Sequence, residues 1–147
     1  MAKTITEANI DDLKEVLGLL ESVELPTEGV ADHFSRFLSA RDGVRIVGCV
    51  GLERYGNAGL LRSLAVAPDV QRTGLGRQLT ARVLNDARAT GVRDVVLLTT
   101  TAADFFARHF GFAPVARLEF DEVFAESPEW RLPRCASAVC MHLRLQD

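Results

Sequence analysis

The segment from residue 71 to residue 77 has the residue types of an anion-binding loop. It combines glycines, arginines and short polar side chains in the order Gln71, Arg72, Thr73, Gly74, Leu75, Gly76 and Arg77. Apolar residues then recur at helical spacing, so the segment leads into the first turn of a predicted helix. That turn has unpaired backbone N–H groups and the positive end of the helix dipole, and glycine lets a ligand approach the backbone closely. The segment therefore predicts a site for a phosphate or another anion.

The residues before the loop narrow the kind of site. An apolar run, Leu60–Val66, predicts a buried strand that stops before Pro68. A Rossmann fingerprint would need a small residue where Leu79 stands, and no Gly-Lys-Ser/Thr marks a P-loop. The order of strand, proline, loop and helix resembles the Q/R-x-x-G-x-G/A pyrophosphate loop of the GCN5-related N-acetyltransferases (GNAT superfamily), found here at Gln71–Gly76. The resemblance implies acetyl-coenzyme A as cosubstrate.

Length and composition limit the class of protein. With 147 residues, 48% of them apolar and 25% charged, we expect one globular domain covering residues 1–147. The net charge of -3 argues against general nucleic-acid binding. No apolar run is long enough to span a bilayer, and the first residues are too polar for a signal peptide. We therefore expect a cytoplasmic protein without a nucleic-acid or membrane partner.

The remaining patterns predict an α/β fold built on a mixed sheet. Strand-like patterns occupy Lys3–Glu7, Phe37–Arg41, Val44–Tyr55, Leu60–Val66, Asp94–Thr100, Pro114–Phe120 and Ala136–Leu145. Asn9 is the predicted cap of a first helix, on which Ile10, Leu13, Leu17 and Leu20 form one apolar stripe. Thr27 is the predicted cap of a second helix, which carries Val30 and Phe34.

The turns, helices and strands after residue 41 extend the predicted fold. Asp42-Gly43 predicts a tight hairpin turn, and Gly91 a helix C-cap. Strand, helix and strand in succession predict a right-handed parallel crossover. A further helix is expected over Ala102–Phe110, while Asp121–Pro133 is either helix or loop. The sum is a sheet of six to seven strands with helices on both faces, in agreement with the N-acetyltransferase fold.

The resemblance also implies how the coenzyme is held. In the family, the strands that match Leu60–Val66 and Asp94–Thr100 splay apart, and the pantetheine arm inserts between them. Backbone groups of Leu64, Ala65 and Val66 would pair with the arm, and an N–H near Leu64 would polarise the acetyl carbonyl. Further coenzyme contacts are expected from Thr100, Ala102, Phe105 and Phe106. The amine would attack the thioester directly, so catalysis rests on positioning and on deprotonation of the ammonium.

Several residues are candidates for the proton-transfer groups. Many relatives carry a tyrosine that protonates the departing thiolate, but Phe105 and Phe106 occupy the matching positions here. Tyr55, His109 or water serves the thiolate, or no general acid is needed; His109 has the alternative of a surface role. Glu53 is the first candidate base, because strand alternation places it on one face with Tyr55. Its alternative is an ion pair with an arginine such as Arg62.

Outside the loop, the sequence resembles a smaller group of acetyltransferases, and this resemblance implies the class of molecule that accepts the acetyl group. The runs Leu60–Val66, Leu97–Ala102 and Pro133–Met141 resemble the acetyltransferases encoded in arsenic-resistance operons. The Leu-Thr-Thr pattern and a serine-bearing last strand are similar to the acetyltransferase domain of N-acetylglutamate synthases. Both imply the α-amino group of an amino acid or a close analogue.

Several side chains are candidates for binding such an acceptor. Arg62 with Ser63 would bind its carboxylate, and hydroxyl groups would come from Thr99, Thr100 and Ser137. The arginines expected on the far wall are Arg117, Arg131 and Arg134. For each arginine, the alternative is an ordinary surface role.

The sequence is also compatible with two other functional classes. A metalloid-binding protein could use the three thiols of Cys49, Cys135 and Cys140. Strand alternation would send Cys135 and Cys140 to opposite faces, however, and Cys49 lies in an apolar run, so we expect no metal site. An enzyme that acetylates proteins would need an open groove for a peptide. The oligomeric state is also open, a homodimer included.

Overall fold

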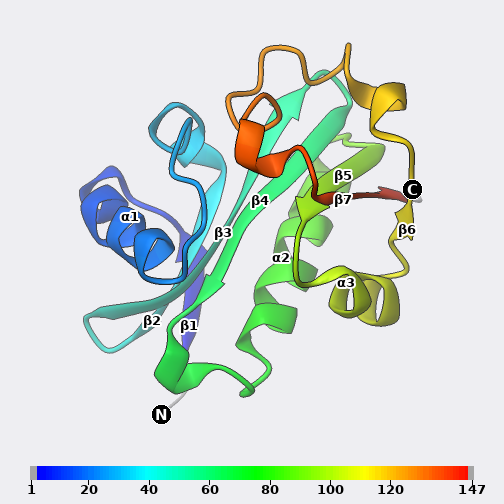
Figure 1. Cartoon of the computed structure of the whole chain (residues 1–147). Coiled ribbons are helices and arrows are strands. Elements are labelled where there is room, and N and C mark those ends of the chain that lie inside the picture. Colours follow the sequence, from blue (N-terminus) through cyan, green and yellow to red (C-terminus); the bar gives the residue numbers. More distant parts are fainter. Residues whose placement is uncertain (1–2, 146–147) are drawn as a thin grey trace. The chain divides into compact units, whose positions relative to one another are not determined.

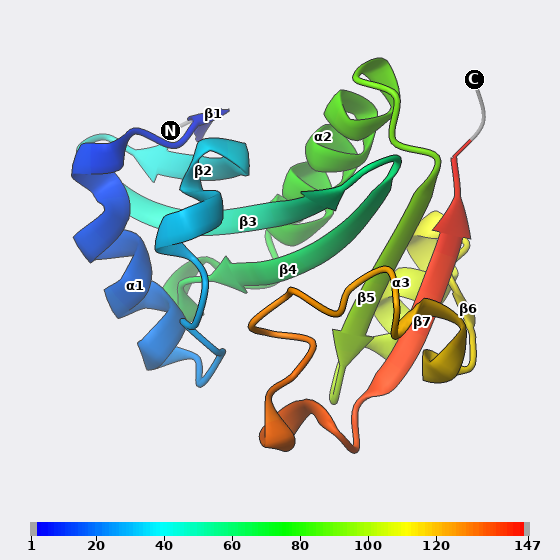
Figure 2. The ribbon, with the colours of Figure 1, turned by 90° about the horizontal axis from the view of Figure 1, so that it is seen from above.

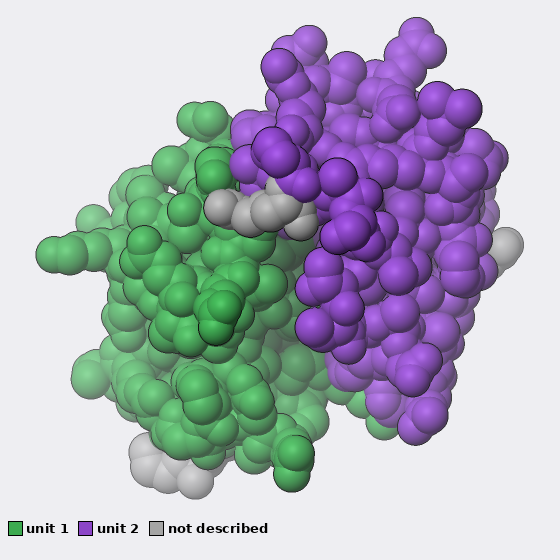
Figure 3. All heavy atoms as spheres, viewed as in Figure 1, with its two compact units in different colours: residues 1–52, 62–86 green, residues 53–61, 87–147 purple. Residues whose placement is uncertain are grey.

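The computed structural model describes residues 3–145, apart from the side chain of Arg134. The chain forms two compact units, one from the residues up to Leu52 with Arg62–Asp86, the other from Glu53–Leu61 with the residues from Ala87 on (Figure 3). Within the described residues, seven strands pair in the order β1-β2-β3-β4-β5-β7-β6. The predicted mixed sheet is therefore confirmed.

The first unit begins with antiparallel strands. β1 (Thr4–Glu7) pairs with β2 (Phe37–Asp42), and β2 pairs with β3 (Arg45–Tyr55) around the predicted turn. Gly43 has a φ of 67°, the left-handed conformation that favours glycine in such a turn. β4 (Ala58–Val66) follows, and its residues from Arg62 on belong to this unit.

The first helix is capped as predicted but is wound differently. The Asn9 side chain accepts from the Asp11 amide at 2.9 Å, and the Asp12 side chain accepts from the Asn9 amide at 3.2 Å. The first turn is a 3-10 helix, η1 (Ile10–Asp12), and only then does α1 (Leu13–Ser22) begin. The tighter turn changes the phase of the helix, so Ile10 is 67% exposed and does not continue the predicted stripe.

The second predicted helix is also wrong. Thr27 caps no helix: its amide donates to Oε1 of Glu28, and Gly29, with a φ of 80°, turns the chain. A short 3-10 helix, η2 (Ala31–Arg36), comes next and ends where Phe37 enters β2. Glycine in the left-handed conformation interrupts the helix that the apolar spacing suggested.

α2 (Leu75–Ala89) packs against β3, as the helical pattern predicted. A Cβ added at Gly48 would lie 3.0 Å from a methyl carbon of Leu79 and 3.1 Å from one of Leu75, so only glycine lets the helix come this close. Within this unit, α1 and α2 lie on opposite faces of the strands (Figures 1 and 2). The expectation of helices on both faces is met.

The second unit contains the parallel pairing. The first residues of β4 pair with β5 (Asp94–Thr99), with a register from Ala58 opposite Asp94 to Leu61 opposite Leu97. β7 (Val139–Arg144) runs antiparallel to β5 on its other side. α3 (Ala103–Phe110) matches the helix expected over Ala102–Phe110 and ends at Gly111, whose φ of 78° is the left-handed conformation typical of a helix C-cap.

Two predicted strands of this unit are wrong or shorter than expected. The strand expected over Pro114–Phe120 is only β6 (Ala113–Pro114), followed by a 3-10 helix, η4 (Arg117–Phe120). Pro114 has no N–H to continue the pairing. The last strand begins at Val139, because Pro133–Cys135 form a 3-10 helix, η5.

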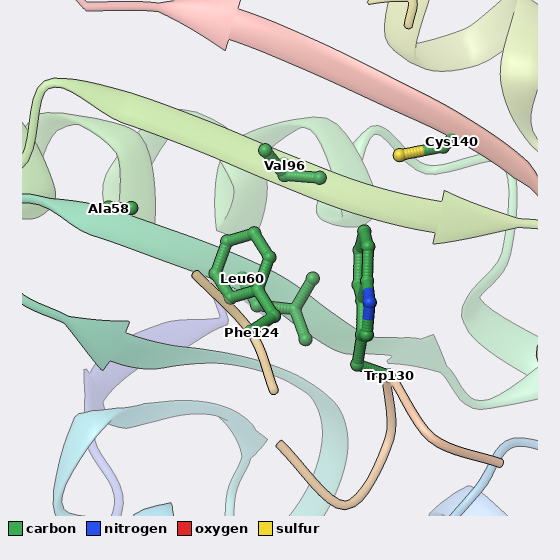
Figure 4. Close-up of a cluster of buried hydrophobic side chains, with 6 residues drawn as sticks. All are labelled: Ala58, Leu60, Val96, Phe124, Trp130 and Cys140. Atoms are coloured by element: carbon green, nitrogen blue, oxygen red, sulfur yellow. The ribbon is translucent and has the colours of Figure 1, made fainter. Parts of the chain in front are cut away.

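The uncertain stretch Asp121–Pro133 is a series of turns held by aromatic side chains. Phe124 and Trp130 pack on Ala58, Leu60, Val96 and Cys140, which together form one buried cluster (Figure 4). The stretch thus covers one face of β4 and β5 with apolar surface. None of the described helices is long and apolar enough to cross a membrane.

Candidate functional site

The predicted anion-binding loop is shaped by bonds to its own flanking residues. Nε2 of Gln71 donates to the Val66 carbonyl at 3.0 Å, and Oγ1 of Thr73 donates to the Val70 carbonyl at 2.6 Å. Arg72 and Gly74 have positive φ values of 67° and 88°. Left-handed residues in such a turn aim successive N–H groups into one concavity, which suits an anion.

The helix that follows exposes its first amides. The bond from the Gln78 amide to the Gly74 carbonyl, 3.0 Å long, opens the helical series, so the amides of Leu75, Gly76 and Arg77 are first-turn donors. The first turn contains no acidic residue. Arg72 and Arg77 are exposed. The local charge is therefore positive where the dipole also favours an anion.

The space in front of the two loop glycines is open. A Cβ added at Gly74 would meet nothing within 4 Å, and one at Gly76 would meet only a methyl carbon of Val66 at 3.8 Å. Gly74 is explained by its positive φ, but Gly76 is inside a helix, where glycine is unfavourable. Among the described residues, no close contact requires glycine at residue 76, which leaves the approach of a ligand as its explanation.

β4 has an unusual backbone conformation just after its pairing with β5 ends. Ser63, two residues after Leu61, has a φ of 62°, an uncommon conformation for a residue other than glycine. Nε of Arg62 donates to Oγ of Ser63 at 2.9 Å, and the Cys49 thiol donates to its carbonyl at 3.3 Å. A strained residue held this way is typical of a functional site. Leu64, the candidate oxyanion donor, is the next residue.

Arg62 is placed differently from the prediction. Its side chain is 2% exposed, and its guanidinium donates to the carbonyls of Glu28 at 2.6 Å and Pro26 at 3.2 Å, besides Ser63. These bonds occupy most of the donor fork that a substrate carboxylate would need. Arg62 therefore positions the loop at residues 26–28.

Glu53 and Tyr55 lie on one face of the strand, as predicted, and form a hydrogen-bonded pair. The Tyr55 hydroxyl donates to Oε1 of Glu53 at 2.6 Å. Glu53 is 0% exposed, whereas Tyr55 is half-buried, with its ring edge against Phe124 at a centroid distance of 5.6 Å. A buried carboxylate in contact with a partly exposed hydroxyl is suited to moving a proton.

The residues at the end of β5 and in α3 have different environments. Oγ1 of Thr99 accepts the Ala102 amide at 2.9 Å, so it closes the turn into α3, while Thr100 is exposed. Phe105 is half-buried, and Phe106 is buried against Phe112 at a centroid distance of 5.6 Å. His109 is exposed and lies edge-on to Phe105, at a distance of 5.2 Å between ring centroids.

Other predicted acceptor residues lie outside regular strands or are already bonded. Ser137 is exposed in the turn before β7, so its predicted place on the last strand is wrong. Arg117 stacks on Trp130 at 4.6 Å and donates to the carbonyls of Trp130 and Cys135. Arg131 is exposed, and the side chain of Arg134 lies outside the described residues.

The three cysteines, Cys49, Cys135 and Cys140, are buried. Burial raises the pKa of Cys49 to about 12 and that of Cys140 to about 11, so both are thiols at neutral pH. In the part of the chain that the structure describes, no three potential ligands come together as a metal site.

The sequence comparison identifies a family. Residues 33–114 match the profile of the acetyltransferase (GNAT) domain. An amino-acid acetyltransferase of Neisseria meningitidis serogroup A is 27% identical over 128 residues, which cover 81% of this chain and 29% of that protein. One from Azotobacter vinelandii is 34% identical over 122 residues, covering 75% of this chain and 27% of that protein. The chain thus spans less than a third of the length of these curated relatives.

Solved structures confirm the fold. N-acetylglutamate synthase from Neisseria gonorrhoeae, complexed with coenzyme A and N-acetyl-glutamate, aligns with a TM-score of 0.84 at 23% identity, over 100% of this chain and 36% of that one. A Mycobacterium tuberculosis protein in complex with CoA aligns with a TM-score of 0.78 at 24% identity, over 97% of this chain and 99% of that one. At this level of identity the likeness concerns the fold.

Proposed function

The chain belongs to the acetyltransferase (GNAT) family, and from this premise we propose that it transfers an acetyl group from acetyl-coenzyme A to the amino group of an amino acid or a close analogue. The observation that carries the proposal is the loop at residues 71–77, with its left-handed turns, first-turn amides and flanking arginines. Curated relatives named amino-acid acetyltransferase support the acceptor class.

The coenzyme would be held along most of its length by the first unit. The amides of Leu75, Gly76 and Arg77 would bind the pyrophosphate, with Arg72 and Arg77 adding positive charge. The backbone of Leu64, Ala65 and Val66 would pair with the pantetheine arm. The resemblance further implies coenzyme contacts from Thr100, Ala102, Phe105 and Phe106. Acetyl-coenzyme A itself supplies the activated thioester.

Glu53 acts as the base through the hydroxyl of Tyr55. The ammonium of the acceptor gives a proton to the Tyr55 oxygen while the Tyr55 proton passes to the Glu53 carboxylate, leaving a neutral amine and a protonated Glu53. The amine then forms the N–C bond, the C–S bond breaks, the amide nitrogen loses its remaining extra proton to water, and the thiolate takes up a proton. The N–H of Leu64 would stabilise the charge on the carbonyl oxygen. His109 or water supplies the proton to the thiolate.

The acceptor side is formed in part by the loop at residues 26–28, which Arg62 holds beside Ser63. The likeness to acetyltransferases of arsenic-resistance operons adds amino-acid-like arsenic compounds to the acceptors worth testing. We place the enzyme in the cytoplasm, with a homodimer as one assembly to test.

A thiol-release assay tests the proposal. Purified protein is mixed with acetyl-coenzyme A and a panel of free amino acids, polyamines, aminoglycosides and peptides, and free coenzyme A is measured. We expect release with one or a few amino acids and none with polyamines or aminoglycosides. Release with peptides alone would replace the proposed acceptor class, and absence of release with every member of the panel would contradict the proposal.

A further inference from the structure

An ion pair lies beside the anion-binding loop, although neither of its residues belongs to the loop. Nη1 of Arg45 donates to Oδ2 of Asp69, and Nη2 donates to Oδ1, both at 2.8 Å. Arg45 is the first residue of β3, and Asp69 lies in the 3-10 helix η3 (Pro68–Val70), two residues before Gln71. Two parallel bonds between a planar guanidinium and a carboxylate fix direction as well as distance.

The same short segment is tied to β3 a second time. The Ala67 amide donates to the Val47 carbonyl at 2.8 Å, and Val70 is buried. The Val70 carbonyl in turn accepts the Thr73 hydroxyl, which belongs to the loop. Residues 67–70 are therefore anchored to β3 directly before the loop, and Arg45 binds the exposed side of this segment.

We infer that Arg45 and Asp69 are a positioning pair that holds the loop in the conformation that binds the phosphates of coenzyme A, an inference that rests on the proposed function. The two side chains are 53% and 59% exposed, and ion pairs with such exposure contribute little to global stability. The effect of the pair is local, because it restricts the backbone directly before the loop. A loop that is ordered before binding loses less entropy when the ligand arrives.

An explanation based on charge alone predicts the opposite change in the affinity for coenzyme A. Asp69 carries a negative charge near a site for an anion, so removing that charge would strengthen binding if only electrostatics mattered. The hydrogen bonds from Arg45 hold the pKa of Asp69 down at about 2, so the carboxylate is charged at any pH used for binding. The sign of the change in affinity therefore separates the two explanations.

The first measurement is the Kd of coenzyme A, by calorimetry, for Asp69→Asn. The matched control is Asp86→Asn, which also removes one negative charge from an exposed pair, that of Arg82 and Asp86 on α2. We expect Asp69→Asn to raise the Kd about three- to tenfold, the range for loss of preorganisation of one or two side chains, and Asp86→Asn to leave it unchanged or lower it. An Asp69→Asn protein that binds as tightly as the wild type, or more tightly, would overturn the inference.

A second pair of variants tests the two-bond geometry. Arg45→Lys keeps the charge but cannot form the fork, and Arg82→Lys is its control. We expect a raised Kd for Arg45→Lys alone; equal values for both would contradict the role of the fork.

Hydrogen exchange of the ligand-free protein decides the inference independently of coenzyme binding. Amides of residues 70–77 should exchange faster in Asp69→Asn than in the wild type or in Asp86→Asn. If the wild type failed to bind coenzyme A, the proposed function would fall, while faster exchange would still support the positioning of the loop. Unchanged exchange of these amides would overturn the inference that the pair of Arg45 and Asp69 positions the loop.

Discussion

The Tyr55 hydroxyl donates a 2.6 Å hydrogen bond to a Glu53 carboxylate that has no exposed surface. Glu53 cannot reach bulk water by itself, whereas Tyr55 is half-buried. A proton that arrives at the Tyr55 oxygen can pass to Glu53 without movement of either side chain. The pair is therefore expected to act as one unit.

Glu53→Gln and Tyr55→Phe should each lower kcat about a hundredfold, within the usual range for general-base catalysis, without changing the Kd of coenzyme A. Phe keeps the ring that packs on Phe124. The double variant should be no slower than the slower single one, because both remove the same proton path. Steady-state kinetics over pH 6 to 10 checks this. An unchanged pH–rate profile in Glu53→Gln would remove Glu53 from the mechanism, and additive losses would separate the two residues.

Gly76→Ala should weaken the binding of coenzyme A without harming the fold. The added methyl group meets only Val66, at 3.8 Å, and alanine favours a helix by up to about 1 kcal/mol. The same methyl group would intrude on the bound phosphate, which should raise the Kd about tenfold or more. Calorimetry gives the affinity and urea unfolding gives the stability.

Gly18→Ala is the control for this change, because Gly18 lies in α1 and a Cβ there meets nothing within 4 Å. It should raise stability and leave the Kd unaltered. Tight binding by Gly76→Ala would show that no ligand approaches the backbone at this position.

The sequence predicts the loop well because every signal for it is local. Glycines, arginines and the helical pattern from Leu75 on lie within one continuous stretch, and backbone conformation there depends on neighbouring residues. The errors in the fold are local conflicts as well. Apolar spacing favoured a helix at Ile10, but a 3-10 turn there changes the phase of the helix. Apolar spacing also favoured a helix after Thr27, but the left-handed Gly29 interrupts it.

The positioning contacts could not be predicted from the sequence. Arg45 and Asp69 are 24 residues apart, and Arg62 binds carbonyls 34 and 36 residues away. A backbone carbonyl has the same chemistry in every residue, so no residue type marks the partners of Arg62. Ser63 gives no sign of its left-handed conformation either, since serine is ordinary in strands.

Arg62→Ala should destabilise the protein and loosen the loop at residues 26–28. Removing the guanidinium leaves two carbonyls and the Ser63 hydroxyl without their donor, which costs about 2–3 kcal/mol. Urea unfolding measures the loss, and cleavage after Glu28 by a glutamyl endopeptidase should become faster. Arg131→Ala, at an exposed arginine, should change neither quantity. Unchanged stability together with a large rise in the acceptor KM would instead support direct binding of a carboxylate by Arg62.

The buried thiol of Cys49 should make stability fall at alkaline pH. Its pKa is about 12 in the folded protein, because burial disfavours the thiolate, against about 8.5 in an unfolded chain. The folded state therefore keeps a proton that the unfolded state loses, and this contribution is complete below pH 8.5 and decreases as the pH rises toward 12. Between pH 7.5 and 9.5 the free energy of unfolding of the wild type should fall by about 1 kcal/mol more than that of Cys49→Ala, as measured by urea unfolding.

Thiol labelling tests the same burial. At pH 8 Cys49 should react slowly with a disulfide reagent in the native protein and fast in the protein unfolded by guanidinium. Rapid native labelling of Cys49, or equal pH dependence of the two proteins, would contradict this and reopen a thiolate site for soft metalloids.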